Sequence, residues 1–259
     1  TRAYKEAKNM DEIARFREIS GNIVFPGFTA PKVAWIERNE PRNFKKISCV
    51  LLPKDYLRFW LTGDLISDMS DAAGTSWLDL KNRCWSEELL NFSKLDLDKM
   101  PTLVEGSQPV GSLRAELKRK WNISGDVIIA GGAGDNAAAA CGCGVISEGT
   151  GFVSLGTSGV LLAARNGCFP APETAIHTFC HAVPEKWYQM GVILAATDCL
   201  NWLSRITEKS PSDLSNKLSK ELSGPSDVIF TPYLSGERTP HNDPLTRGAF
   251  IGLDVRHDI

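Results

Sequence analysis

The stretch 126–142 constrains the fold more than any other part of this sequence. Residues 126–130 form the β-branched and apolar run typical of a buried strand, and the glycine-rich residues 131–134 follow directly. Asp135 and Asn136 then open a run of alanines, the residue with the highest helix propensity. The stretch therefore predicts a strand, a glycine turn and a helix, which is a building unit of α/β folds.

Other parts of the chain add helices and strands in mixed order. Apolar residues recur every three positions in 1–20, which predicts a mostly solvent-facing helix. Capping and periodicity signals predict a helix that Thr29 caps and Pro41 ends, a buried strand at 50–52, helices at 55–61 (closed by Gly63) and 112–121, a hairpin of 152–155 and 160–162, a strand at 187–194 and a helix at 195–206. This mixture indicates an α/β or α+β architecture.

The charge balance excludes several classes of function. The chain has 259 residues, with 29 Lys and Arg against 31 Asp and Glu, and a formal net charge of -2. We therefore expect no nucleic-acid partner and no binding to an anionic membrane. Asp135 and Asp198 interrupt the two most apolar stretches. No membrane span is expected, because one needs about 18 uninterrupted apolar residues.

The cysteines and the first residues indicate the setting of the protein. Seven cysteines are scattered without the spacing of a disulfide framework, which predicts a reducing, cytoplasmic location. The sequence begins with charged residues and has neither an initial Met nor an apolar signal segment. We expect it to be an internal piece of a longer protein.

Asp135 allows two readings. A carboxylate beside a glycine turn can accept a proton from a hydroxyl group, and Asn136 beside it could bind a polyol. Alternatively, Asp135 caps the alanine helix and Asn136 is a turn residue; the residues alone favour capping. A dinucleotide site at 132–137 is a poor third reading, since Asp135 would face the pyrophosphate with a like charge.

A second glycine turn lies about twenty residues further on. Residues 156–159 read Gly-Thr-Ser-Gly and offer backbone N–H groups and two hydroxyls, which suit a phosphate oxygen. An ordinary hairpin turn is the alternative. The chain has no P-loop motif, yet a carboxylate at one turn and hydroxyls at the next together suit phosphoryl transfer.

Two clusters of polar residues are interpreted as structural features. His177, Cys180 and His181, with Cys141 and Cys143 elsewhere, lack the paired spacing of a zinc site, so we expect core packing and no metal ligands. The polar loop 236–244 could be catalytic, but a rigid turn with internal ion pairs is at least as well supported.

Several motifs together resemble the FGGY family of carbohydrate kinases. The longest is 27–39, Gly-Phe-Thr-Ala-Pro-Lys-Val-Ala-Trp-Ile-Glu-Arg-Asn, which fits a family signature throughout. Further segments of the same kind are 52–57, 67–75, 131–136, 154–159 and 233–242. The resemblance covers practically the whole chain and is greatest to members that phosphorylate D-xylulose.

The resemblance implies a fold and a division of the chain. The fold would be α/β, an actin-like ATPase (ribonuclease-H-like) two-domain sugar kinase, here truncated at both ends. Residues 1–145 would be the C-terminal part of the sugar-binding domain, and 146–259 the N-terminal part of the nucleotide-binding domain. The family's first phosphate loop and its adenosine motif would lie outside the chain, so we expect the chain alone to be inactive.

The resemblance also implies roles for individual residues. Asp135 would be the general base, and Asn136, Asp135 and Phe28 would contact the sugar. The nucleotide-binding positions would be Gly156, Thr157, Ser158, Thr197 and Asn201. The whole protein would use ATP and Mg²⁺ to convert D-xylulose to D-xylulose 5-phosphate, with no other partner except a second copy in a homodimer. The alternatives are a kinase for another ketose or polyol, and a non-catalytic actin-like module that binds sugar or nucleotide.

Overall fold

The computed structural model describes residues 2–218, 224 and 227–257, and the chain divides into two compact units. Unit 1 comprises the residues up to Phe152 together with Leu162–Glu173 and His177–Gln189. Unit 2 comprises Val153–Leu161, Thr174–Ile176 and the residues from Met190 on. A domain boundary after residue 145 stays a prediction.

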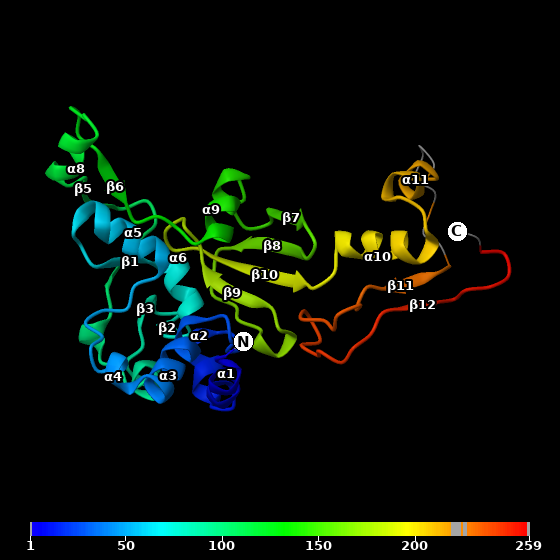
Figure 1. The fold of residues 1–259 in the computed structure, drawn as a ribbon, viewed down its shortest axis with the longest axis horizontal. Helices are drawn as coiled ribbons and strands as arrows, with labels where there is room; N and C mark the ends of the chain where they lie inside the picture. The colour runs from blue at the N-terminus through cyan, green and yellow to red at the C-terminus, as the bar shows by residue number, and fades with distance from the viewer. Residues whose placement is uncertain (1, 219–223, 225–226, 258–259) are drawn as a thin grey trace. The chain divides into compact units, whose positions relative to one another are not determined.

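Unit 1 begins with four helices, which are drawn in blue in Figure 1: α1 (Tyr4–Asp11), α2 (Ala14–Ser20), α3 (Thr29–Asn39) and α4 (Pro41–Phe44). The prediction of one solvent-facing helix over 1–20 is wrong, because the backbone is extended at Ile13 and the apolar face is buried. Met10 and Phe16 enter a core that also contains Val33, Trp77 and Leu89.

The helix boundaries that proline and glycine set are close to the predicted ones. Phe28, with an extended backbone, precedes the first residue of α3, so Thr29 lies inside the helix and does not cap it. Pro41 ends α3 and also opens α4, since proline suits a first helical turn. Gly63 closes α5 (Pro53–Thr62) in the left-handed conformation with φ 99°, as predicted.

Two apolar segments differ from their predictions. Residues 50–52 form no strand; they are half-buried, and Val50 N–H donates to the Lys99 carbonyl at 2.9 Å. The helix predicted at 112–121 is shorter, α8 (Ala115–Lys120), because β5 (Pro109–Ser112) takes the start of the segment.

The strand before the glycine turn is β6 (Ile128–Ala130), which pairs antiparallel with β5. It is not buried as predicted: Ile128 is 68% exposed, because β5 is its only strand neighbour among the described residues. The turn leads into α9 (Asp135–Gly142), whose buried Ala137 and Ala140 lie one helical turn apart.

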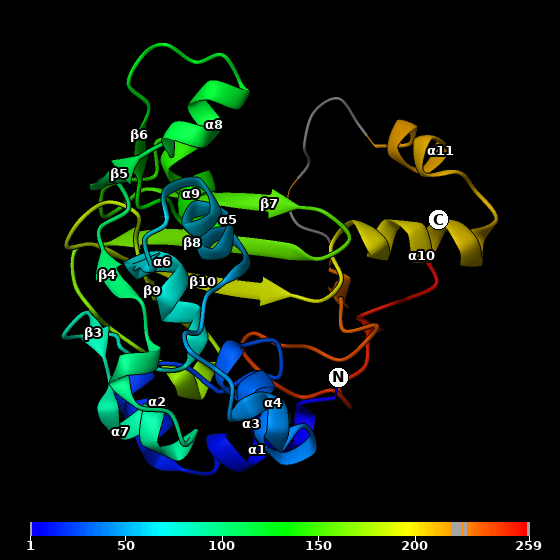
Figure 2. The ribbon, with the colours of Figure 1, turned by 60° about the vertical axis from the view of Figure 1, so that its left-hand side comes forward.

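A short parallel pair, β1 (Ile66–Asp68) with β4 (Thr102–Val104), leads into α6 (Met69–Ala72). β1 contacts both α6 and α5, and Figures 1 and 2 show α6 and α5 in the same part of unit 1. The smaller elements of unit 1 are η1 (Ala73–Thr75), β2 (Leu78–Asp79), β3 (Cys84–Trp85), α7 (Glu87–Phe92) and η2 (Leu97–Lys99).

A four-stranded sheet has the order β7-β8-β10-β9. Its strands are β7 (Gly151–Leu155), β8 (Gly159–Arg165), β9 (His177–Cys180) and β10 (Trp187–Ile193), with η3 (Pro172–Thr174) before β9. The hairpin and the later strand therefore occur as predicted. Unit 2 continues with α10 (Thr197–Thr207), which was predicted at 195–206, then α11 (Pro211–Asn216) and the antiparallel pair β11 (Ile229–Thr231) and β12 (Ala249–Ile251).

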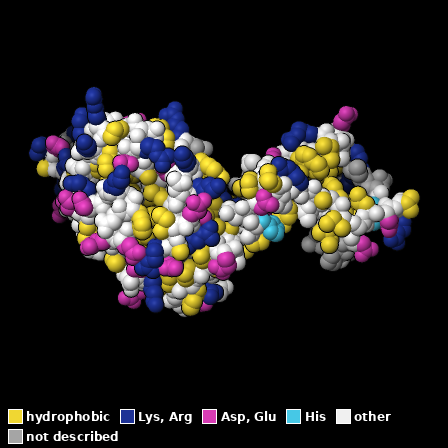
Figure 3. All heavy atoms as spheres, turned by 90° about the horizontal axis from the view of Figure 1, so that it is seen from below, with side chains coloured by type: hydrophobic (Ala, Val, Ile, Leu, Met, Phe, Trp, Pro, Cys, Tyr) yellow, Lys and Arg dark blue, Asp and Glu magenta, His cyan; other side chains and the backbone are white. Residues whose placement is uncertain are grey.

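The structure shows the state of the cysteines, the length of the helices and the distribution of surface charge. All seven cysteines are free. In the described part of the chain, no helix has the length and apolar character needed to cross a membrane. On the face shown in Figure 3, Lys and Arg side chains are interspersed with Asp and Glu, in keeping with the small net charge.

Core packing is confirmed for His177, Cys180 and His181, which are buried in unit 1, but it is wrong for Cys141 and Cys143, which are exposed. The His181 ring contacts the Val145 carbonyl through Nε2 at 3.0 Å, and its Nδ1 accepts from Val183 N–H at 3.0 Å. His177 stacks on Phe179 with ring centroids 5.3 Å apart. Both imidazoles are thus buried parts of the packing, and the expectation that they bind no zinc stays a prediction.

Candidate active site

The glycine turn of unit 1 requires glycine for reasons of space and of backbone conformation. A Cβ at Gly131 would lie 2.4 Å from the Glu105 carbonyl oxygen, and Gly132 has φ 82°. Gly132 N–H donates to the Gly106 carbonyl at 2.9 Å, and Arg58 donates to the Gly131 carbonyl. The chain at the start of α9 is therefore closely held.

Asp135 is the first residue of α9, and its side chain is exposed. Its Oδ1 accepts from Asn136 N–H at 2.7 Å and from the Asn136 amide at 3.1 Å. Gly134, not Asp135, is the N-cap, so the capping reading holds only in part: one carboxylate oxygen satisfies one free N–H of the helix. Oδ2 has no hydrogen bond within the described part of the chain and stays open to a ligand.

A buried group of charges lies next to this turn in unit 1. Lys54 Nζ is 2.5 Å from Asp55 Oδ1, 2.7 Å from Asp68 Oδ1 and 3.8 Å from Asp71 Oδ2. The aliphatic stem of Lys54 lies against Gly132, where a Cβ would be 3.3 Å from Lys54 Cδ. We call Lys54, Asp55, Asp68 and Asp71 the Lys54 cluster.

The Lys54 ammonium does not compensate the three carboxylates of the Lys54 cluster equally. Burial lowers the pKa of Lys54, but the charge of Asp68 and hydrogen bonds to Asp55 and Asp68 outweigh burial, so the pKa is raised overall. Burial raises the pKa of Asp71 to about 6; Lys54 opposes this shift, and the charges of Asp68, Asp55 and Asp135 add to it. Asp71 is thus the carboxylate that Lys54 compensates least.

Three carboxylates within 4.8 Å of one another would also suit a cation. Here the Lys54 ammonium already lies among them, so the positive charge comes from the chain itself. No other group of three such ligands occurs in the described residues. The Lys54 cluster was not predicted as part of the site, although the run Ser67-Asp68-Met69-Ser70-Asp71 after an apolar segment is an available signal.

In unit 2 the structure brings together the residues of the predicted nucleotide site. The Gly156 carbonyl accepts from Thr197 N–H at 3.0 Å and from the Thr197 hydroxyl at 2.7 Å. Ala196 N–H donates to the Thr157 carbonyl at 2.8 Å. The hairpin turn is thereby fixed against the first turn of α10.

The exposed groups of this turn are those with which a ligand could bond. Thr157 and Ser158 are exposed, and so are Thr197 and Asn201. Thr197 and Asn201 are four residues apart on α10 and therefore share one face of the helix. A hydroxyl-rich turn beside a helix N-terminus can bind an anion.

Phe28 and the loop 236–244 each make contacts within their own unit of the chain. Phe28 is half-buried among aromatic rings, with centroid distances of 5.8 Å to Phe25, 5.9 Å to His177 and 6.1 Å to Phe179. In the loop 236–244, Glu237 Oε1 accepts from Leu194 N–H at 3.0 Å and Arg238 N–H at 2.7 Å. Hydrogen bonds therefore hold the loop, and the choice between a catalytic loop and a rigid turn stays a prediction.

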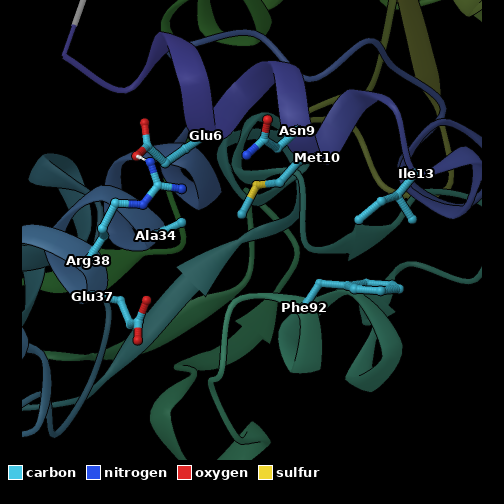
Figure 4. A pocket seen from close by; sticks show the side chains of 8 residues that line it. All are labelled: Glu6, Asn9, Met10, Ile13, Ala34, Glu37, Arg38 and Phe92. Carbon is cyan, nitrogen blue, oxygen red and sulfur yellow. Dashed lines mark ion pairs between the residues drawn. The ribbon is translucent and has the colours of Figure 1, made fainter.

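A separate hollow in unit 1 is lined by α1, α3 and α7 side chains (Figure 4). Two of its lining side chains, Glu6 and Arg38, form an ion pair, with Glu6 Oε1 2.7 Å from Arg38 Nη1. Its lining consists of Glu6, Asn9, Met10, Ile13, Ala34, Glu37, Arg38 and Phe92. None of the predicted site residues lines it, so it is not part of the candidate active site.

Comparisons with known proteins identify the family of the chain. Residues 1–142 match the N-terminal domain, and residues 151–259 the C-terminal domain, of the FGGY family of carbohydrate kinases. The xylulose kinase of Klebsiella pneumoniae is 48% identical over 250 residues, and that of Escherichia coli 47% identical over 247 residues. Each alignment covers 95% of this chain and 51% of the relative.

Solved structures give the same result. A crystal structure described as a xyloylose kinase from Brucella ovis is 57% identical, with a TM-score of 0.95, and the match covers 100% of this chain and 53% of that one. The ligand-bound xylulose kinase from Lactobacillus acidophilus is 26% identical, with a TM-score of 0.86 over 98% of this chain and 52% of that one.

The matched proteins are longer than this chain. The chain spans about half the length of the relatives it matches. The fold class predicted from the sequence is confirmed, since these relatives have the actin-like two-domain architecture of sugar kinases. The family models cover nearly every residue, and the chain belongs to the FGGY family of carbohydrate kinases.

Proposed function

We propose that the whole protein to which this chain belongs transfers the γ-phosphoryl group of MgATP to the 5-hydroxyl of D-xylulose. The relatives described as xylulose kinases, at 47–48% identity, support this substrate. The observation that carries the proposal is the exposed Asp135 carboxylate at the start of α9, with Oδ1 bound to Asn136 and Oδ2 open.

In the proposed reaction Asp135 is the general base. Its Oδ2 accepts the proton of the sugar hydroxyl while that oxygen forms a bond to the γ-phosphorus and the bond to ADP breaks. Asn136 orients the base through its two contacts with Oδ1. The proposal assigns sugar contacts to Asn136, Asp135 and Phe28.

The nucleotide side of the proposal rests on unit 2. Gly156, Thr157 and Ser158 would bind the phosphates through backbone N–H groups and hydroxyls, and Thr197 and Asn201 would contact the nucleotide along α10. Phosphoryl transfer depends mainly on alignment and charge stabilisation, which suits a turn whose backbone is fixed by Thr197 and Ala196. Mg²⁺ enters with the nucleotide as part of the substrate MgATP.

Replacing the base tests the proposal. In the full-length protein we expect Asp135→Asn to lower kcat by about 10²–10⁴-fold, the usual contribution of a general base, with ATP binding unchanged. The measurement is ADP release with a panel of pentuloses and polyols, together with ATP titration by calorimetry. Asp126→Asn is the matched control, because Asp126 precedes the same turn but its side chain is 97% exposed and pairs with Lys118 on the surface.

The panel separates the proposal from its alternatives. Preference for another ketose or polyol would keep the mechanism and change the substrate. Binding of sugar or ATP without ADP release would favour a non-catalytic module. Near-normal turnover by Asp135→Asn would contradict the assignment of the base.

A further inference from the structure

We propose that Ser70 is a positioning residue that fixes the location of Asp135 through the backbone of the glycine turn. The inference rests on the proposed function, because it assigns Ser70 a role in presenting the general base. Ser70 touches neither substrate in this scheme and acts through Gly134.

The contact joins two distant parts of unit 1. The Ser70 hydroxyl oxygen accepts a hydrogen bond from Gly134 N–H at 3.0 Å, across 64 positions in the sequence. Gly134 is the N-cap of α9 and immediately precedes Asp135. The hydroxyl therefore holds the last peptide group before the base.

The direction of this hydrogen bond is fixed by Asp68. The Ser70 hydroxyl donates to Asp68 Oδ2 at 2.5 Å, and this oxygen also accepts from Ser70 N–H at 2.9 Å and Asp71 N–H at 3.2 Å. A hydroxyl has one proton, so with that proton on Asp68 its lone pairs are available to Gly134. Ser70 and Asp68 are buried, which excludes water as a competing partner.

Lys54 completes the support. Its ammonium lies 2.7 Å from Asp68 Oδ1, so each oxygen of Asp68 has a defined partner. The chain Lys54, Asp68, Ser70, Gly134 runs from a buried charge to the start of the helix that carries Asp135. The support therefore consists of the Lys54–Asp68 ion pair and the hydrogen bonds that Asp68 Oδ2 accepts.

A rigid glycine turn should affect the rate of the reaction, because it fixes the position of Asp135. Misplacement of a catalytic group by about 1 Å can cost roughly 10²-fold in rate. Ser70→Ala leaves Gly134 N–H without its acceptor and allows the turn to relax. In the full-length protein we expect kcat to fall by about 10–100-fold, while the KM for ATP stays within about twofold because the nucleotide residues lie in unit 2.

Ser67→Ala provides a matched control. Ser67 is also buried and also donates to the Lys54 cluster, with its hydroxyl 2.7 Å from Asp55 Oδ2, a residue of α5 and not of the glycine turn. Both variants lose one buried serine hydroxyl bonded to a carboxylate. A role in stability alone predicts equal effects of the two substitutions on melting temperature and on kcat.

The experiment measures kcat, both KM values, Tm and amide hydrogen exchange at Gly134 for Ser70→Ala, Ser70→Thr, Ser67→Ala and Asp135→Asn. We expect Ser70→Ala alone among the serine variants to lower kcat and to speed exchange at Gly134, and Ser70→Thr, which keeps the hydroxyl, to restore much of kcat. Asp135→Asn tests the base in the same assay.

The outcomes separate the two proposals. If Asp135→Asn is inactive while Ser70→Ala and Ser67→Ala have equal kcat, Ser70 is not a positioning residue. If Asp135→Asn is active, the proposed base is wrong. Should Ser70→Ala fold poorly, the Gly134 exchange rate and kcat of Ser70→Thr decide, because the proposal requires slow exchange and much of the wild-type kcat in that variant.

Discussion

At the scale of single residues, the Lys54 cluster distributes one positive charge among three carboxylates. Asp55 and Asp68 lie within 2.7 Å of the ammonium, whereas Asp71 lies 3.8 Å away. Coulomb attraction weakens with distance, so Asp71 receives the least compensation for its burial. Burial raises the pKa of Asp71 to about 6, and Lys54 offsets only part of this rise.

The raised pKa predicts a pH dependence of stability. Because the folded value of about 6 exceeds the ordinary 3.8, the folded state binds the proton more tightly between these values. The free energy of unfolding should therefore fall as pH rises from about 4 to 6 and stay reduced above 6. Asp71→Asn should remove this loss, about 1–2 kcal/mol after allowance for partial exposure.

Urea denaturation at about pH 4.5 and about pH 7.5, on either side of the shifted pKa, checks this prediction. The stability that Asp71→Asn gains over the wild type should be larger at the higher pH. The exposed Asp126→Asn serves as the control and should show little difference between the two conditions. An equal effect of Asp71→Asn at both pH values would contradict the unequal charge distribution in the cluster.

At the scale of elements, the hairpin turn of unit 2 depends on two glycines in different ways. A Cβ at Gly159 would lie 2.8 Å from Ile193 Cγ1 and 3.2 Å from Ala196 Cβ, whereas at Gly156 the nearest atom is the Ser158 carbonyl oxygen at 3.5 Å. Gly159 is therefore required for close packing of β8 on β10 and on the start of α10. Gly156 leaves open space in front of its backbone.

The two glycines can be separated by substitution. Gly159→Ala should destabilise the protein by about 1–3 kcal/mol, the usual cost of overpacking, and this is measured by thermal unfolding. Gly156→Ala should leave Tm nearly unchanged. If the turn binds phosphate as proposed, Gly156→Ala should still raise the KM for ATP, since a methyl group would occupy the approach to the backbone.

Local signals in the sequence predicted elements whose ends depend on backbone conformation. Gly63 and residues 131–134 marked real boundaries because glycine allows conformations that other residues avoid. The apolar residues 50–52 were wrongly predicted as a strand, because hydrophobicity does not show whether a strand partner exists. The strand at 128–130 was found but its burial was wrongly predicted, for the same reason.

The residues of the candidate site were predicted unequally. Family resemblance supplied Asp135, Asn136 and the 156–158 turn with Thr197. Ser70 and Lys54 lie in segments that resemble the family, but the resemblance gave them no role, because their contacts with 132–134 cross more than sixty positions. Phe28 illustrates the opposite case: its aromatic contacts explain its residue type without a ligand.

At the scale of the whole molecule, unit 1 has its own hydrophobic core around Phe16. Phe16 is fully buried and contacts Phe92 with ring centroids 5.5 Å apart, while Phe92 is 44% exposed. The chain spans about half of the relatives it matches, yet this core is made entirely from residues of unit 1.

A homodimer, a cytoplasmic location and the inactivity of the chain alone stay predictions.

Phe16 and Phe92 contact each other but differ in burial, so their replacement by alanine should change the free energy of unfolding by different amounts. Phe16→Ala should lower the free energy of unfolding by about 3–5 kcal/mol, since it removes a buried ring and leaves a cavity. Phe92→Ala should cost markedly less, because much of that ring is already in solvent. Denaturant unfolding monitored by tryptophan fluorescence measures both, and similar losses would contradict the assignment of Phe16 to the centre of the core.

The two hydrogen bonds from Asn136 to one oxygen of Asp135 affect the direction in which the other oxygen can meet a hydroxyl group. With Oδ1 anchored, rotation of the carboxylate is restricted, and Oδ2 offers its lone pairs in a nearly constant direction. A primary alcohol at the end of a chain can turn about its last carbon–carbon bond to meet that direction. A secondary alcohol can do so only by moving the carbon chain on both sides of it, so if Asp135 is the base as proposed, a terminal hydroxyl reaches Oδ2 with the least movement of the rest of the sugar.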